Sequence, residues 1–172
     1  AERARSLKSL AFGTSNKFMH QDIGFNYRLT NLQAAIGCAQ LEKLDWVVEK
    51  KREIAHFYNE HLRDIPGLQL PVEKPYARNV YWMYHVVLHD EFGHSREKVM
   101  QKLKDCGIET REAFIPYNMQ EIFVRRGWVQ PDECPVANYV GQHGLYLPSG
   151  PLLDAKEQEY IVDSIKSIQW GE

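Results

Sequence analysis

The feature of this chain that most constrains its fold is a long stretch of apolar residues at helical spacing, from Leu32 to about Leu62. Apolar side chains recur there every three or four residues, which is the period of one face of an α-helix. A helix of ~30 residues is long for a globular protein, so we expect a bend near Asp45-Trp46. The charged run 50–53 reads as its solvated face. Small residues in the first turns would let a second element or a second subunit approach closely: Ala34, Ala35, Gly37, Cys38 and Ala39.

A polar segment, Gly24 to Asn31, leads directly into this stretch, and we call it the hook. Thr30 and Gln33 have the spacing of a capping box, which places the helix N-terminus here. Asn26 and Arg28 bring an amide and a guanidinium to the positive end of the helix dipole. Free backbone N–H groups and a forked cation at a helix N-terminus suit a phosphate or a carboxylate. The alternative is that both side chains only close a surface loop.

The segments on either side of the long stretch are shorter. Residues 1–13 read as a short helix ended by Gly13, and residues 14–23 read as a polar loop with His20 and Asp22 in solvent. The turn Ile65-Pro66-Gly67 ends the long helix. The predicted strands are Leu68–Val72 at an edge, Val80–Leu88 as a central strand, Ile108–Phe114 and Gly144–Leu147. The predicted helices are 96–105 between Ser95 and Gly107, 134–140, and a final helix capped by Asp154 and Glu157, with 119–131 irregular.

This order predicts an α/β chain with an α+β small domain. A long N-terminal helix would lead into a small, mostly antiparallel sheet that helices cover on one face.

Composition excludes several classes of protein. The formal net charge is −2 and no basic stripe is present, which argues against nucleic acid as a partner. No apolar run approaches the ~20 residues of a membrane span. The chain starts with charged residues, shows no signal peptide and has no initiator Met, so we expect it to begin within a protein. Three distant cysteines fit a reducing cytoplasm better than a disulfide framework: Cys38, Cys106 and Cys134.

Common catalytic and metal-binding motifs are absent from the sequence. Seven histidines occur, but none has HExxH spacing or a cysteine pair beside it, so we expect no metal site. We expect His85 to be a satisfied core or interface histidine and Ser149 to be a turn residue. No GxSxG, Walker or GxGxxG motif occurs.

The run GFNYRLTNLQAAIGCAQLEKLD resembles the segment that opens the C-terminal half of DegT/StrS-type sugar aminotransferases. Three further stretches resemble that family in the same order: Ala1–Arg5 with Leu7 and Gly13, Gly107–Arg111, and Leu145–Gly150. These are pyridoxal-phosphate (PLP) enzymes of the aspartate-aminotransferase fold that aminate nucleotide-linked keto-sugars. The resemblance implies three parts: the tail of the cofactor domain (1–23), the hook and a long interface helix (24–62), and a C-terminal small α/β domain (63–172).

The resemblance also implies roles in cofactor binding. In the family, the asparagine matching Asn26 reaches across a homodimer to the partner's PLP phosphate, and the arginine matching Arg28 lies nearby, toward substrate. Tyr27 fits packing equally well. The family holds PLP on a lysine in a Ser-rich segment followed by a glycine-rich turn, and no such segment occurs here. Three lysines that we considered lack the Ser-rich segment and the glycine-rich turn: Lys8, Lys17 and Lys43. We therefore expect the chain to start just after that lysine and to be inactive alone.

A second segment, from Arg111 to Gln120, resembles a family turn of the form T-R-P-x-F-x-P-x-H that lies near the sugar nucleotide. It implies substrate contacts by Arg111, Phe114, Pro116, Tyr117 and Asn118. The two rings could stack on a base or sugar, and the guanidinium could meet a diphosphate. Glu112 and Asn118 replace the usual proline and histidine, which leaves the substrate open. The alternative is that the rings fill the core of the domain.

The resemblance therefore implies the C-terminal portion of a cytoplasmic PLP-dependent aminotransferase that moves an amino group from glutamate to a nucleotide-linked keto-sugar. Two alternatives remain open from the sequence. One is a non-catalytic partner or regulatory domain of the same fold, and the other is an unrelated small α+β ligand-binding module.

Overall fold

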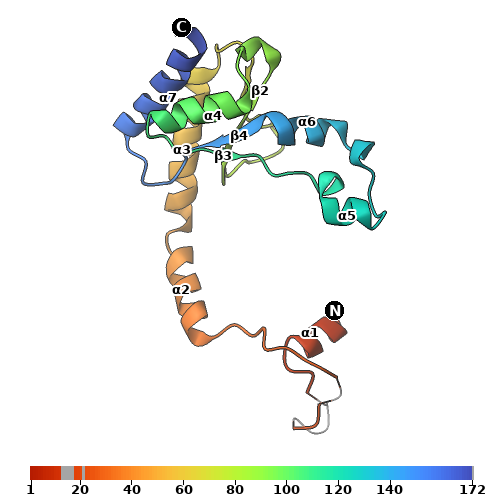
Figure 1. Ribbon diagram of the computed structural model, residues 1–172. Coiled ribbons are helices and arrows are strands. Elements are labelled where there is room, and N and C mark those ends of the chain that lie inside the picture. The colour runs from red at the N-terminus through yellow and green to blue at the C-terminus, as the bar shows by residue number, and fades with distance from the viewer. Residues whose placement is uncertain (13–17, 21, 172) are drawn as a thin grey trace. The chain divides into compact units, whose positions relative to one another are not determined.

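The computed structural model describes residues 1–12, 18–20 and 22–171 and divides into two compact units, residues 1–45 and 46–172 (Figure 1). The helices are α1 (Glu2–Leu7), α2 (Asn31–Leu41), α3 (Leu44–Leu62), α4 (Arg96–Asp105), α5 (Glu121–Arg125), α6 (Pro135–His143) and α7 (Ala155–Trp170). The strands are β1 (Leu68–Gln69), β2 (Tyr84–Leu88), β3 (Arg111–Glu112) and β4 (Gly144–Leu147). Short 3₁₀ turns are η1 (Asp90–Phe92), η2 (Tyr117–Met119) and η3 (Pro131–Glu133). The predicted three-part division does not coincide with these units and stays a prediction.

In the first unit, α1 is shorter than predicted. It ends at Leu7, and a continuation to Gly13 is excluded by positive φ angles of 69° at Leu10 and 51° at Ala11, which lie outside the helical region. The predicted end at Gly13 lies outside the described residues, as do 14–17 and 21. His20 is exposed as predicted, but its Nδ1 lies 2.7 Å from the carbonyl oxygen of Leu10, so it is tied to the backbone.

The predicted long helix is two helices. The capping box that begins α2 is confirmed, since the Gln33 N–H donates to Thr30 Oγ1 and the Thr30 N–H donates to Gln33 Oε1. The interruption falls at Glu42 and Lys43, a few residues before the predicted bend. There the Lys43 N–H donates to the carbonyl of Gln40, three residues back, which closes α2 with a 3₁₀-type turn.

In the second unit, the four strands form one antiparallel sheet in the order β1-β2-β4-β3. The predicted central position of β2, the edge position of β1 and the bounds of β4 are confirmed. Tyr84 pairs with Leu147 and His85 pairs with Tyr146 across β2 and β4. Because paired residues share a face, Tyr84 lies on one face of the sheet and His85 on the other.

Several predicted elements of this unit differ from the structure. β2 starts four residues later than predicted, because Tyr81 has a φ of +46° and breaks the extended backbone. β1 and β3 have two residues each and are much shorter than predicted. The segment 119–131, predicted to be irregular, contains α5.

The core of the second unit lies between the Tyr84 face of the sheet and α3, α4 and α7, which gather around it in Figure 1. Its largest fully buried side chains include Tyr58, Tyr84, Leu62 and Leu103. Each of the two leucines contributes about 1.5–3 kcal/mol through burial. The Tyr58 hydroxyl donates to the carbonyl of Pro148 at 2.8 Å and so fixes the loop after β4 to α3.

The predicted caps of the last two core helices are confirmed. Ser95 caps α4, Gly107 follows it with a φ of +77°, and Asp154 with Glu157 forms the capping box of α7. None of the helices in the described part of the chain is long and apolar enough to cross a bilayer. All three cysteines are exposed and free.

Candidate functional site

The hook is held by backbone pairing with the segment after α1. The Phe25 N–H donates to the carbonyl of Leu7, the Leu10 N–H donates to the carbonyl of Phe25, and Ser9 and Asn26 form an antiparallel bridge. A glycine is needed where the two segments meet, since a Cβ at Gly24 would lie 2.2 Å from the carbonyl carbon of Leu10. The backbone around Asn26 is therefore fixed by its neighbours.

The side chains of Asn26 and Arg28 face open space. Both are exposed, and neither makes a hydrogen bond or an ion pair with any residue that the structure describes. The Arg28 guanidinium lies 5.9 Å from the centre of the Phe12 ring, the one interaction recorded for it in the described chain. An exposed amide and an unneutralised cation, next to the N-terminus of α2, are suited to a phosphate.

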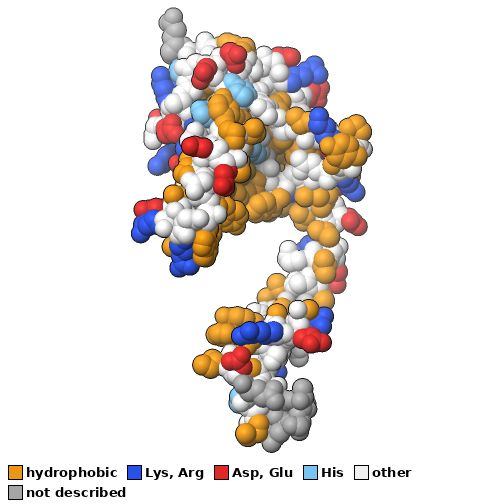
Figure 2. Space-filling view, turned by 90° about the vertical axis from the view of Figure 1, so that its right-hand side faces the viewer, with side chains coloured by type: hydrophobic (Ala, Val, Ile, Leu, Met, Phe, Trp, Pro, Cys, Tyr) orange, Lys and Arg blue, Asp and Glu red, His pale blue; other side chains and the backbone are white. Residues whose placement is uncertain are grey.

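Exposed apolar side chains occur on the surface of the first unit (Figure 2). Tyr27 is 73% exposed and its ring stacks on that of Phe25 at 5.4 Å. No residue of α2 is buried, and Leu32 and Ile36 are 80% and 65% exposed. A largely apolar helix with no buried residue normally packs on another surface.

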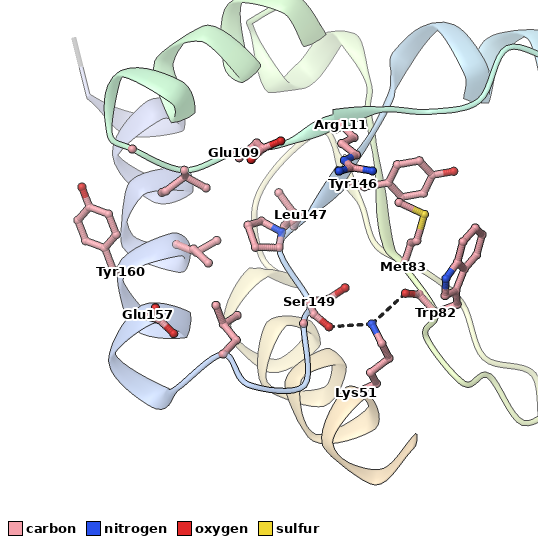
Figure 3. Close-up of a pocket in the computed structure, with 16 residues that line it drawn as sticks. Lys51, Trp82, Met83, Glu109, Arg111, Tyr146, Leu147, Ser149, Glu157 and Tyr160 are labelled. Carbon is pink, nitrogen blue, oxygen red and sulfur yellow. Dashed lines mark hydrogen bonds between the residues drawn. The ribbon is translucent and has the colours of Figure 1, made fainter. Parts of the chain in front are cut away.

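The second unit contains a cavity of about 750 Å³ between β3, β4 and α7. Figure 3 shows Arg111, Tyr146, Met83 and Trp82 along one side of it, and Glu157 and Tyr160 of α7 on the opposite side. Lys51 from α3 lies at its base. The cavity therefore combines charged side chains with aromatic rings.

The Lys51 side chain links the two loops that border this cavity through hydrogen bonds. Its Nζ donates to the carbonyl of Trp82 at 2.9 Å and to the carbonyl of Ser149 at 2.8 Å (Figure 3). Desolvation lowers the pKa of the Lys51 ammonium below its usual value. Ser149 is 9% exposed and lies in the turn after β4, so its placement as a turn residue is confirmed.

The residues from Arg111 to Asn118 lie in three environments: the cavity, the protein surface and the interior. Arg111 lies in β3 opposite Tyr146 and lines the cavity. Phe114 and Tyr117 are 65% and 78% exposed, so the alternative in which these rings fill the core is wrong. The Phe114 ring lies 5.8 Å from that of Tyr146, at the side of the sheet.

Pro116 and Asn118 support this segment. Pro116 packs on α6, where a Cβ at Gly141 would lie 2.7 Å from its Cδ. Asn118 is 6% exposed, and its Nδ2 donates to the carbonyl of Pro131 at 2.7 Å and to Oδ1 of Asn138 at 2.8 Å. Both amide protons are thus used within the chain, which gives Asn118 a supporting position in this structure.

Of the residues that line the cavity, sequence reasoning named Arg111 as a site residue and missed the others, including Lys51, Trp82 and Tyr146. Lys51 belongs to a charged run that resembled a solvated face. Trp82 was expected in a strand, beside Tyr84. The pairing of β4 with β2 and β3, together with the hydrogen bonds of Lys51 from α3, brings segments far apart in sequence to one cavity.

His85 differs from its prediction as a satisfied histidine. Its Nε2 is buried without a hydrogen-bond partner, and burial lowers the pKa of its imidazole. Its ring packs on Tyr146 at 5.0 Å. Within the described ranges, no three His, Cys, Asp or Glu side chains are grouped so that they could hold a metal ion.

Comparison with known proteins gave consistent matches over nearly the whole chain. The sequence model of the DegT/DnrJ/EryC1/StrS aminotransferase family matches residues 1–166. GDP-perosamine synthase of Escherichia coli O157:H7 is 32% identical over 167 residues, which cover 97% of this chain and 44% of the relative. EpsN of Bacillus subtilis (strain 168), a putative pyridoxal phosphate-dependent aminotransferase, is 33% identical over 163 residues, or 94% of this chain and 42% of EpsN.

Among solved structures, DesV of S. venezuelae matches with a TM-score of 0.84 and 26% identity, covering 99% of this chain and 44% of DesV. The chain thus spans less than half the length of each of these relatives.

Proposed function

Because this chain belongs to the DegT/DnrJ/EryC1/StrS aminotransferase family, we propose that it is the C-terminal portion of a PLP-dependent aminotransferase that acts on a nucleotide-linked keto-sugar. Enzymes of this family use pyridoxal 5'-phosphate, and the fold is the C-terminal part of theirs, as the sequence predicted. Membership of the family removes the alternative of an unrelated ligand-binding module. The name of the Escherichia coli relative, GDP-perosamine synthase, supports a nucleotide sugar as the substrate class.

The observation that carries this proposal is the exposure of Asn26 and Arg28 without partners among the described residues. In the proposed enzyme these two side chains bind the phosphate of a PLP held by a second subunit. Bound PLP supplies the electron sink for amino transfer, and glutamate is the proposed donor. The residues of this chain anchor and orient the phosphate rather than move protons.

The exposed surface of α2 supports the homodimer that this arrangement requires. Leu32 and Ile36 are largely exposed, and small residues lie between them. We propose that α2 packs on the second subunit and so brings the hook to the neighbouring cofactor. Burying such apolar side chains stabilises association by ~25 cal/mol per Å² of apolar surface.

We propose that the cavity and the exposed part of segment 111–117 lie toward the sugar nucleotide. Arg111 offers a cation, Phe114 and Tyr117 offer ring faces, and Pro116 and Asn118 hold the segment in place. The exposed free thiols fit a reducing compartment, so we place the enzyme in the cytoplasm.

Complementation tests this function. The chain is co-expressed with the N-terminal part of the Escherichia coli relative that it does not match, and PLP absorbance and amino transfer are measured on the purified mixture. We expect neither half to turn over alone and the mixture to retain PLP and transfer an amino group from glutamate. A mixture that associates but retains no PLP would contradict the proposal.

A further inference from the structure

Trp82 is a large apolar side chain left on the surface at the edge of the cavity. It is 68% exposed, although tryptophan is mostly buried in folded proteins. Figure 3 shows its indole on the same side of the cavity as Met83 and Tyr146. Trp128 and Trp170 are exposed to a similar extent, so it is the position of Trp82 beside the cavity that lets its indole contact a bound ligand.

The backbone on both sides of this indole is fixed. Tyr81 has a φ of +46°, which is strained for a bulky residue. Its ring is 2% exposed and its N–H donates to Oδ1 of Asn79 at 2.8 Å. Lys51 holds the carbonyl of Trp82 itself at 2.9 Å. These contacts hold the backbone at Tyr81 and Trp82 in its strained conformation. In that conformation the Trp82 indole lies on the surface.

The indole belongs to a row of rings beside two cations. Its centre lies 6.4 Å from that of Phe114 with an angle of 21° between the planes, and Phe114 contacts Tyr146 in turn. Arg111 lines the same cavity and makes no ion pair with any residue in the described ranges. Lys51 also makes no ion pair there and uses two of its three N–H groups on carbonyls.

Neither carboxylate of the cavity lies beside Trp82 (Figure 3). Glu157 is on α7, across from Trp82 in Figure 3, and its Oε2 accepts from the Asp154 N–H at 2.9 Å. Glu109 precedes β3, lies near Arg111 in Figure 3 and is exposed to solvent. The part of the cavity next to Trp82 is therefore aromatic and cationic, which suits a ligand with a planar ring and a negatively charged group.

We propose that Trp82 is a substrate-contacting residue whose indole stacks on the base of a nucleoside diphosphate, with the phosphates directed to Arg111 and Lys51. This inference rests on the proposed function for the choice of a nucleotide over another anionic ring compound. Trp82 then contributes affinity for the base, while the two cations contribute affinity for the phosphates.

Calorimetric titration of the whole chain with GDP, UDP and inorganic pyrophosphate tests the inference. The variants are Trp82→Leu, which keeps an apolar side chain without a ring, and Trp82→Phe, which keeps the ring. The matched control is Trp128→Leu, since Trp128 is 64% exposed and does not line the cavity. Circular dichroism checks that each variant is folded.

We expect Trp82→Leu to weaken binding of the nucleoside diphosphates about 10-fold. Trp82→Phe should restore most of the affinity, and pyrophosphate should bind the wild type and Trp82→Leu equally. Unchanged affinity of Trp82→Leu for GDP and UDP, or an equal loss for pyrophosphate, would overturn the inference. Absence of nucleotide binding by the wild-type chain would overturn it as well.

The titration is independent of PLP and turnover. A chain that binds nucleotide through Trp82 but fails complementation would contradict the proposed function alone. A chain that complements but binds nucleotide without Trp82 would overturn this inference alone.

Discussion

Gly144 lies directly against the imidazole of His85, so closely that a Cβ at position 144 would be 2.2 Å from His85 Nε2. The same Cβ would lie 2.5 Å from the carbonyl oxygen of Val140 in α6. The first residue of β4 is therefore a glycine because strand, helix and imidazole meet there without space for a side chain. Two predictions about stability follow from this packing.

Replacing Gly144 by Ala should destabilise the second unit by roughly 1–3 kcal/mol, because either the imidazole or α6 must move. Chemical denaturation monitored by tryptophan fluorescence measures the change in free energy of unfolding. Gly150→Ala is the matched control, since a Cβ there meets nothing within 4 Å. Equal stability of the two variants would show that the contact at Gly144 is not tight.

Acidification should destabilise the protein through His85. Burial lowers the pKa of this imidazole in the folded state, so the unfolded state binds the proton more readily. The contribution is fully present well above pH 6.5, the usual pKa of histidine, and is lost as the pH falls below that value. Because the ring is partly exposed, we expect a loss of at most about 1 kcal/mol between pH 7.5 and pH 5.5.

The measurement compares the free energy of unfolding of the wild type and of His85→Leu at both pH values. The variant lacks the titrating group, so its stability should fall less on acidification. An identical pH dependence in both proteins would assign the effect to other groups.

Lys51→Met should loosen the loops that border the cavity. The substitution removes two hydrogen bonds to carbonyl groups while keeping an unbranched apolar chain, and we expect a loss of roughly 1–3 kcal/mol. The matched control is Lys50→Met, since the Lys50 side chain is 43% exposed and pairs only with Glu53 on the surface. Chemical denaturation of both variants measures the change in the free energy of unfolding. A free energy of unfolding of Lys51→Met equal to that of Lys50→Met would remove the role given to this ammonium.

Features determined by a few adjacent residues were predictable from the sequence. The capping boxes at Thr30 and Asp154 and the end of α4 before Gly107 are confirmed, because each depends on side chains within one turn of a helix. The bounds of β4 were also predicted, since Pro148 follows it. The resemblance of the hook to a known family was the strongest functional signal.

Features determined by tertiary contacts were not predictable. The positive φ of Tyr81 is stabilised by the burial of its ring and shortens β2. The cavity depends on the pairing of β4 with two strands and on Lys51 from α3, and no local pattern reports these contacts. The unpaired Nε2 of His85 likewise results from packing against Gly144.

The central claim is that Arg28 completes a cofactor site across a subunit interface, and retention of PLP by the complemented assembly tests it most directly. PLP is measured by absorbance after gel filtration, with Arg63→Glu as the matched control because Arg63 is an exposed arginine outside the hook. Arg28→Glu should weaken PLP retention by about 10-fold or more while the assembly stays intact, because a guanidinium–phosphate contact is replaced by repulsion. PLP retention equal to that of Arg63→Glu, in an intact assembly, would contradict the claim.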